Sequence, residues 1–202
     1  MIRNILFDMG DVLIHFDRDV LLNRYDLPPA DRELLLREVL LSVEWSMLDR
    51  GSLHDAEMLA IVNRRLPERL HRAARGLVSE WDQPLVPVEG MEELARELHE
   101  AGYRLFLLSN ASSRQHEYWP RIPGAAYFED TLISADVHLV KPQPEIYRAA
   151  LDKFGILAEE SVFIDDNSLN IEGACNAGIH GIVFHLDAEE LRRKLAEIGV
   201  LC

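Results

Sequence analysis

The sequence predicts an α/β protein built on a doubly wound, Rossmann-like parallel sheet, with a small helical module inserted after the first strand. Two observations support this fold class. From about residue 85 onwards, short apolar segments alternate with amphipathic helical segments, a pattern typical of such sheets. Residues 15–84 instead carry apolar residues at helical spacing and no convincing strand. We therefore expect a core of residues 1–14 and 85–202 and a helical insertion of residues 15–84.

The first expected element is the apolar run Ile2–Phe7, which contains no turn residue and should form a strand buried on both faces of the sheet. After the helical region, strands and helices are expected to alternate. In chain order they are helix 91–101, strand 104–109, strand 130–134, helix 144–154, strand 162–165, helix 169–177, strand 181–184 and helix 188–198. Gly102, Gly155 and Gly178 follow three of these helices, as a left-handed helix cap requires.

Composition and charge narrow the class of function. The 202 residues are 48% hydrophobic and carry a formal net charge of −14, from 35 acidic and 21 basic side chains. A field of this sign disfavours binding to nucleic acid or to anionic lipid. The opening segment reads as neither a secretory signal nor a membrane span, and Cys175 and Cys202 lack zinc-site or disulfide spacing. We expect a cytoplasmic protein, with the oligomeric state open and a monomer slightly favoured.

Polar residues that directly follow the expected strands are the candidates for chemistry, because sheets of this kind bind ligands beyond the carboxyl ends of their strands. The adjacent acids Asp165 and Asp166 would repel each other at a buried strand end and need a cation or protons. If Asp8 lies nearby, three acids converge, which suits Mg²⁺. The rule selects Asp8, Ser109–Asn110 and Asp165–Asp166–Asn167.

Each of these signals also has a plain structural explanation. Asp8 and Ser109–Asn110 could cap a turn or a helix, and Lys141 could be an exposed lysine before a proline that favours a helix start. The functional interpretation is that Ser109 and Asn110 supply hydroxyl and amide donors to phosphate oxygens, while Lys141 supplies a positive charge. Taken together, the residues combine a nucleophilic carboxylate, donors, a lysine and an acidic metal pair.

At this point the sequence resembles the haloacid dehalogenase-like superfamily, over the whole chain. Residues 15–84 then resemble the helical cap that this superfamily inserts after its first strand. Within the superfamily, the chain is most similar to small bacterial sugar-phosphate phosphatases of the α-D-glucose-1-phosphatase group; Asn170–Ala174, Trp119–Pro120 and the ending Leu201–Cys202 add to this likeness. The motifs that carry the resemblance are Phe7–Leu13, Leu108–Asn110, Lys141–Pro142 and Phe163–Asn167.

The resemblance implies a magnesium-dependent phosphatase that acts on a small phosphorylated metabolite, such as glucose 1-phosphate. Asp8 attacks phosphorus to form an aspartyl phosphate, which water hydrolyses. The metal is held by Asp8, by the main-chain carbonyl of Gly10 and by Asp166, with Asp165 in a supporting position, although Asp165 and Asp166 could exchange roles. Lys141 offsets the phosphate charge, and the phosphate oxygens are oriented by Ser109 and Asn110.

One position departs from the superfamily pattern. Most of its phosphatases carry a second Asp two residues after the nucleophile, as general acid for the leaving group, and this chain has Gly10. Glycine keeps the carbonyl ligand but supplies no proton. The replacements open from the sequence are Asp11, His15 and water.

Two rival functions remain open. A haloacid dehalogenase would use the same Asp8 without a metal, but such enzymes lack the acidic pair. A non-catalytic member that binds phosphorylated ligands would explain Gly10. Substrate choice should depend on residues of the helical insertion, where the candidates are Trp45, Met47, Leu48 and Arg50; core packing is the simpler role for Trp45 and Leu48.

Overall fold

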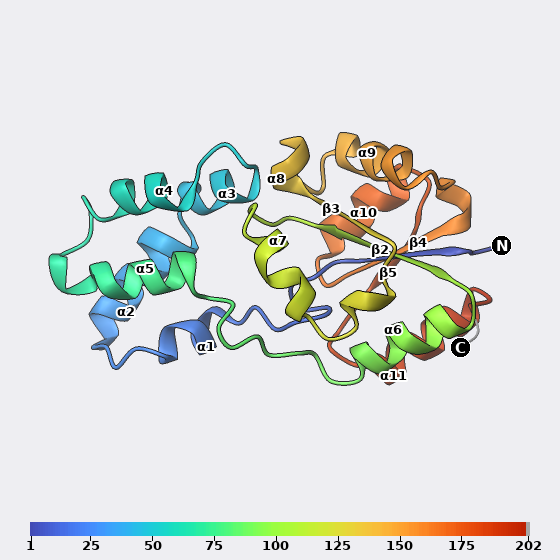
Figure 1. The fold of residues 1–202 in the computed structure, drawn as a ribbon, viewed down its shortest axis with the longest axis horizontal. Coiled ribbons are helices and arrows are strands. Elements are labelled where there is room, and N and C mark those ends of the chain that lie inside the picture. Colours follow the sequence, from blue (N-terminus) through green and yellow to red (C-terminus); the bar gives the residue numbers. More distant parts are fainter. Residues whose placement is uncertain (201–202) are drawn as a thin grey trace.

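The protein folds around a five-stranded parallel sheet with the strand order β3-β2-β1-β4-β5 (Figure 1). The computed structural model describes residues 1–200, so Leu201 and Cys202 lie outside the described residues. The expected fold class is confirmed. The strands are β1 (Asn4–Phe7), β2 (Arg104–Ser109), β3 (Asp130–Ile133), β4 (Ser161–Asp165) and β5 (His180–Val183).

Helices cover both faces of the sheet (Figure 1). Because side chains alternate along a strand, Ile5 and Phe7 pack in one apolar cluster and Leu6 packs in another. The first cluster includes Leu94 and Leu191 from the helices on its face, and the second includes Ile146. These helices are α6 (Met91–Glu100) and α11 (Ala188–Glu197) on one face, and α9 (Pro144–Phe154) and α10 (Ser168–Asn176) on the other.

Between β1 and α6 the chain forms a group of helices that lies beside the sheet, on the left in Figure 1. We call residues 18–79 the helical segment. It comprises α1 (Arg18–Asn23), α2 (Pro29–Leu35), the π-helical turn Leu36–Leu40, α3 (Val43–Asp49), α4 (Asp55–Val62), the 3₁₀ turn Glu68–Leu70 and α5 (His71–Ser79).

Short helical pieces occur where the sequence predicted none. They are α7 (Gln115–Tyr118), α8 (Ser134–Val137) and the 3₁₀ turns Trp119–Arg121, Ala125–Tyr127 and Ala158–Glu160. Each has three or four residues, about one helical turn, which is too short to produce a periodic apolar pattern. The three glycine caps are confirmed, since Gly102, Gly155 and Gly178 have φ angles of +91°, +62° and +85°.

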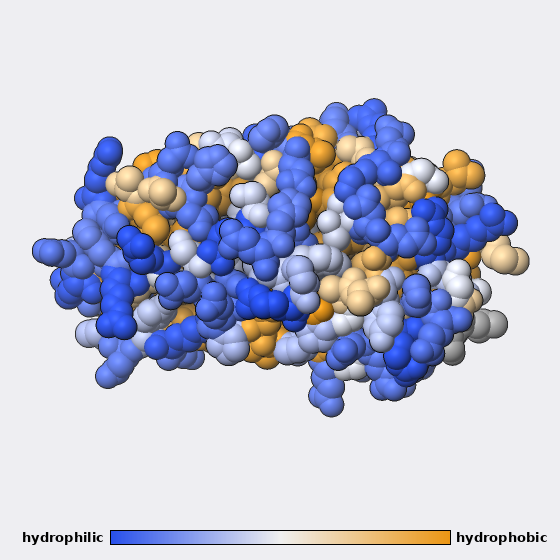
Figure 2. Space-filling view, in the orientation of Figure 1, coloured by the Kyte–Doolittle hydropathy of each residue, from blue (hydrophilic) through white to orange (hydrophobic). Residues whose placement is uncertain are grey.

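The face of the molecule in Figure 2 is mostly hydrophilic, with its apolar residues in small separate groups. This agrees with the 28% of charged residues in the sequence. Among the described residues, no helix is both long enough and apolar enough to cross a lipid bilayer.

The helical segment meets the core at a close main-chain contact. The Ser134 hydroxyl at the start of α8 donates to the carbonyl of Asp49, the last residue of α3, and accepts from the Ala111 amide at 2.9 Å. Beside this bond, Gly51 has a φ angle of +71°, and a side chain there would overlap the Ala135 carbonyl. Only glycine at position 51 therefore allows this turn to approach the main chain at Ala135 this closely.

We expect Gly51→Ala to lower the free energy of unfolding by about 2–4 kcal/mol, because the new methyl group adds overlap to left-handed backbone strain. Gly102→Ala is the matched control, since its φ angle is also positive but nothing lies within 4 Å of the added atom. The control should lose only about 1–2 kcal/mol. Urea unfolding of both variants measures the difference, and equal losses would contradict a tight contact at Gly51.

Candidate active site

The central strand β1 delivers Asp8 to the carboxyl edge of the sheet. Phe7 lies in register with Leu107 on one side and with Ile164 on the other, so the next residues of the three strands converge. The Asp8 amide donates to the Ile164 carbonyl at 2.8 Å, which continues the strand pairing to the site. Asp8 is buried, with 8% of its surface exposed.

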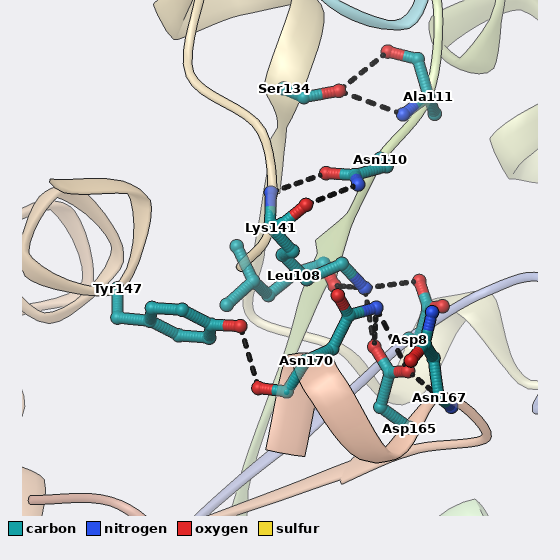
Figure 3. Close-up of polar contacts among 10 residues, drawn as sticks. All are labelled: Asp8, Leu108, Asn110, Ala111, Ser134, Lys141, Tyr147, Asp165, Asn167 and Asn170. Carbon is teal, nitrogen blue, oxygen red and sulfur yellow. Dashed lines mark hydrogen bonds and ion pairs between the residues drawn. The ribbon is translucent and has the colours of Figure 1, made fainter. Parts of the chain in front are cut away.

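A fully buried lysine joins two of the acids (Figure 3). The Lys141 Nζ atom lies 2.9 Å from Asp8 Oδ1 and 2.6 Å from Asp165 Oδ2, and it donates to the Leu108 carbonyl at 3.1 Å. Burial acts to lower the pKa of Lys141, but the two carboxylates outweigh it and raise that pKa above its usual value. Lys141 is therefore held as a cation inside the site.

Asn110 fixes the main chain on which Lys141 is carried. Its Oδ1 accepts from the Lys141 amide at 2.8 Å, and its Nδ2 donates to the Lys141 carbonyl at 3.1 Å (Figure 3). The sequence analysis expected this side chain to orient phosphate oxygens, and that contact stays a prediction. The neighbouring Ser109 hydroxyl acts to lower the pKa of Asp8, which favours the ionised form of that carboxyl.

Asp165 is saturated by hydrogen bonds. Its Oδ1 accepts from the Asn167 amide at 2.8 Å, and the Asn170 Nδ2 lies 3.0 Å from both carboxylate oxygens. Together with Lys141, these donors occupy the whole carboxylate. Sequence reasoning assigned no role to Asn170; the available signal was an amide one helical turn beyond the Asn167 cap, on the helix that follows the acidic pair.

Asp8, Asp165 and Asp166 each offer an oxygen within 4.8 Å of the others. Burial raises the pKa of Asp8 to about 6, against the opposing effect of Lys141 and with a further rise from Asp165. Burial and Asp165 also raise the pKa of the more exposed Asp166. One lysine cannot neutralise three carboxylates, so the cluster has excess negative charge.

The donor set fits a hard divalent cation such as Mg²⁺. Asp8 Oδ1 is buried and receives no hydrogen bond, although it lies in an ion pair with Lys141. Within the described residues, the Gly10 carbonyl also accepts no hydrogen bond. These oxygens, with the exposed carboxylate of Asp166, are available as ligands, whereas the oxygens of Asp165 are already engaged.

A cavity of about 390 Å³ lies between the core and the helical segment, and we call it the Asp8 cavity. Its core side includes Asp8, Gly10 and residues 109–112. Four aromatic residues form part of its wall. Their rings contact one another, with distances of 5.0–5.7 Å between ring centroids. These are Phe16, Trp45, Trp81 and Tyr118.

A second cavity adjoins the site, lined by Arg50, Met47, Lys141 and Asn110, and we call it the Arg50 cavity. All four candidates for substrate choice therefore line one of the two cavities: Trp45 and Leu48 line the Asp8 cavity, and Met47 and Arg50 the Arg50 cavity. Trp45 and Leu48 also belong to the apolar core, as the packing interpretation expected.

Asp49 lines both cavities, and the sequence analysis did not single it out. Its position carries a signal that could have been used. Asp49 is the last residue of α3, and the last turn of that helix has no basic residue. An acid at a helix C-terminus is unfavourable because it faces the negative end of the helix dipole. An unfavourable acid next to Gly51 is a reason to look for a function.

Replacing Lys141 by methionine should lower the free energy of unfolding by about 3–5 kcal/mol at neutral pH, because Asp8 and Asp165 lose their shared buried cation. Lys153→Met is the matched control: Lys153 pairs with Asp130 at 2.9 Å, but both side chains are nearly half exposed. That pair should contribute at most about 1 kcal/mol. Chemical unfolding compares the two, and a Lys141→Met loss as small as the control would contradict the buried pair.

A family model described as haloacid dehalogenase-like hydrolase matches residues 2–178. The pyrophosphatase PpaX of Halalkalibacterium halodurans is 32% identical over 99 residues, which cover 48% of this chain and 46% of that protein. The first four curated relatives are matched over only 37–47% of their own length, so the chain spans about half of them or less.

Solved structures share the fold. A HAD family enzyme of Bacteroides thetaiotaomicron, in complex with magnesium and inorganic phosphate, matches with a TM-score of 0.72 and 24% identity, over 95% of this chain and 99% of that one. The L-2-haloacid dehalogenase of Xanthobacter autotrophicus matches with a TM-score of 0.67 and 18% identity, over 100% of this chain and 85% of that one. The magnesium- and phosphate-bound enzyme and the dehalogenase thus have the same fold as this chain. The fold alone therefore does not tell which of the two reactions a protein catalyses.

Proposed function

The chain belongs to the haloacid dehalogenase-like hydrolases, and we propose that it is a magnesium-dependent phosphatase of small phosphorylated metabolites. The observation that carries the proposal is the cluster of Asp8, Asp165 and Asp166 around one buried lysine. A relative named as a pyrophosphatase and a structural neighbour solved with magnesium and inorganic phosphate support a phosphoryl substrate.

In this proposal Mg²⁺ would be held by the carboxylates of Asp8 and Asp166 and by the Gly10 carbonyl. Bound there, the ion would offset the negative charge of the phosphoryl group. Asp165 would support the site without binding the metal directly, because its oxygens already accept hydrogen bonds from Lys141 and Asn170. This supports the assignment of Asp166, and not Asp165, as the direct ligand.

The remaining steps use the chain's own residues. A carboxylate oxygen of Asp8 attacks phosphorus, and the bond from phosphorus to the leaving oxygen breaks. Lys141 neutralises charge on the phosphoryl oxygens, and Ser109 donates to them, since both already lie against Asp8. Water then attacks phosphorus, releases inorganic phosphate and restores the Asp8 carboxylate. The residues act mainly by alignment and charge neutralisation.

The acidic cluster also argues against the two rival functions. A metal-free dehalogenase has no use for a third carboxylate, and the exposed Asp166 would only add repulsion next to Asp8 and Asp165. A phosphate-binding protein without catalysis would gain nothing from three carboxylates beside its anionic ligand. We therefore favour hydrolysis of a phosphate ester.

For the substrate we propose a sugar phosphate, glucose 1-phosphate being one example, met in the cytoplasm. The Asp8 cavity is of a size that suits a small ligand. Its aromatic wall offers flat apolar surface for a sugar ring, and Ser42, Ser46 and Arg18 offer polar contacts to hydroxyl groups. We propose that the helical segment acts as a cap that selects the substrate. A panel of sugar phosphates and other phosphate esters tests this choice.

Asp8→Asn should lower magnesium-dependent phosphate release by about 1000-fold or more, because the amide is not a nucleophile. A single turnover of the wild-type protein in ¹⁸O-labelled water distinguishes the rivals by mass spectrometry. A phosphatase puts the label into inorganic phosphate, since water attacks phosphorus. A dehalogenase puts it into Asp8, since water attacks the ester carbon. Label in Asp8, or full activity of Asp8→Asn, would contradict the proposal.

Asp166→Asn should abolish most of the rise in melting temperature that millimolar Mg²⁺ produces, because it removes a ligand. Asp165→Asn is the comparison: it should keep that rise but melt at a lower temperature without metal, because Lys141 loses a partner. The opposite result would exchange the roles of the two acids.

The same rise in melting temperature should grow as the pH increases through about 6, the pKa to which burial raises Asp8. Protonated Asp8 cannot bind the metal. In metal-free protein the sign is reversed: a raised folded-state pKa contributes stability that is fully present below the unfolded value of 3.8 and is lost as the pH rises through about 6. Melting curves with and without Mg²⁺ between pH 5 and 8 separate the two effects.

A further inference from the structure

The site as described lacks a proton donor for the leaving group. Cleaving an alkyl phosphate without protonating the departing oxygen is slow, and a positioned acid accelerates such a step by about 10²–10⁴-fold. Gly10 has no side chain to donate. The gap is not imposed by packing, because a side-chain carbon at Gly10 would meet only Phe16, at 3.6 Å. The inference below rests on the proposed phosphatase function.

The residues that lie along the Asp8 cavity leave few sources for the proton. Its titratable side chains, among the described residues, are Asp8, Arg18, Asp49 and Tyr118. Asp8 is the nucleophile, and a guanidinium does not release its proton in proteins. Burial and the nearby acids raise the pKa of Tyr118 above its usual value, which makes its phenol a weaker acid. Asp49 is the remaining candidate.

Asp11 and His15, the two residues considered from the sequence, do not line the Asp8 cavity. Both line a different cavity, which shares Phe16 and Arg18 with the Asp8 cavity. The Asp11 Oδ1 atom accepts a hydrogen bond from the Phe16 amide at 2.9 Å and lies 4.0 Å from His15 Nδ1. The Asp11 carboxylate is thus engaged with the local main chain.

Asp49 is held in place by its main chain. Its carbonyl accepts from the Ser134 hydroxyl. That hydroxyl also accepts from the amide of Ala111, two residues after Ser109, as Figure 3 shows. Gly51 fixes the following turn against Ala135. The end of α3 is therefore tied to the same loop that carries Ser109 and Asn110, next to the expected phosphoryl position.

The side chain of Asp49 is free to act. Within the part of the chain that the structure describes, its carboxyl group has no hydrogen-bond or ion-pair partner. The other charged groups on the two cavities it lines are Asp8, Arg18, Arg50 and Lys141. Burial and, to a smaller extent, Asp8 raise the pKa of Asp49 to about 7. A neutral, proton-bearing form is accordingly available near neutral pH.

We propose that Asp49, supplied by the helical segment, is the general acid of this enzyme and replaces the acid missing at Gly10. As Asp8 forms its bond to phosphorus, the bond from phosphorus to the leaving oxygen breaks and that oxygen takes the proton of Asp49, so an alcohol departs. In the second half, the Asp49 carboxylate takes a proton from the water that attacks phosphorus. The bond to Asp8 then breaks, inorganic phosphate leaves, and both side chains return to their starting states.

The test measures kcat/KM of the Asp49→Asn variant and of the wild-type protein on two substrates. This constant reports the steps up to departure of the alcohol. The first substrate is p-nitrophenyl phosphate, whose leaving group needs little protonation. The second is the best primary alkyl phosphate of the substrate panel. We expect kcat/KM to fall about 100-fold or more for the alkyl ester and less than about tenfold for the aryl ester.

Asp26→Asn is the matched control, because Asp26 is an exposed acid of the helical segment that lines neither cavity. It should leave both substrates unchanged. Melting temperature and inhibition by inorganic phosphate verify that the Asp49→Asn site is intact. If that variant loses the same factor on both esters, or nothing on the alkyl ester, Asp49 is not the acid. If the wild-type protein hydrolyses neither ester, the proposed phosphatase itself is wrong, and this role with it.

Discussion

The site depends on one buried ammonium group. Lys141 lies inside the protein with no exposed side-chain surface, and it is stable there only because Asp8 and Asp165 provide opposite charge within hydrogen-bonding distance. The surrounding contacts support this arrangement: the Leu108 carbonyl accepts a hydrogen bond from the ammonium group, and Asn110 holds the main chain of Lys141. Two carboxylates and a cation are thereby set in one place at the carboxyl edge of the sheet.

The parallel sheet explains why residues so far apart in the chain can meet. β1 is central, so the end of β1 lies between the ends of β2 and β4. Each of these three strands carries a candidate site residue at its carboxyl end, and the loop before α9 adds Lys141. Strong apolar packing on both faces of the sheet holds these strand ends in register. The polar site is thus supported by an apolar structure that takes no part in the chemistry.

Much of this could be predicted from the sequence, for physical reasons that also explain what could not. The periodic apolar pattern and the cap at Gly155 predict both ends of α9 correctly. A four-residue helix such as α8 is too short to leave a periodic pattern. The meeting of Asp8 with Asp165 follows from strand ends sharing an edge. The bond between Asn110 and the Lys141 main chain is a tertiary contact that no local pattern encodes. Asp49 was overlooked because the side of α3 that faces the cavity depends on how the helical segment packs on the core.

The Ser134 hydroxyl is a small contact between the core and the helical segment. It joins the Ala111 loop to the end of α3 through a single side chain, and the bond to Ala111 lies wholly within the core. The cluster of Asp8, Lys141 and Asp165 is therefore assembled by the sheet and its loops, while the helical segment supplies only part of the wall of the Asp8 cavity. During evolution, the side chains of the helical segment can change without disturbing the acidic cluster, as long as the main chain at Asp49 still reaches that hydroxyl.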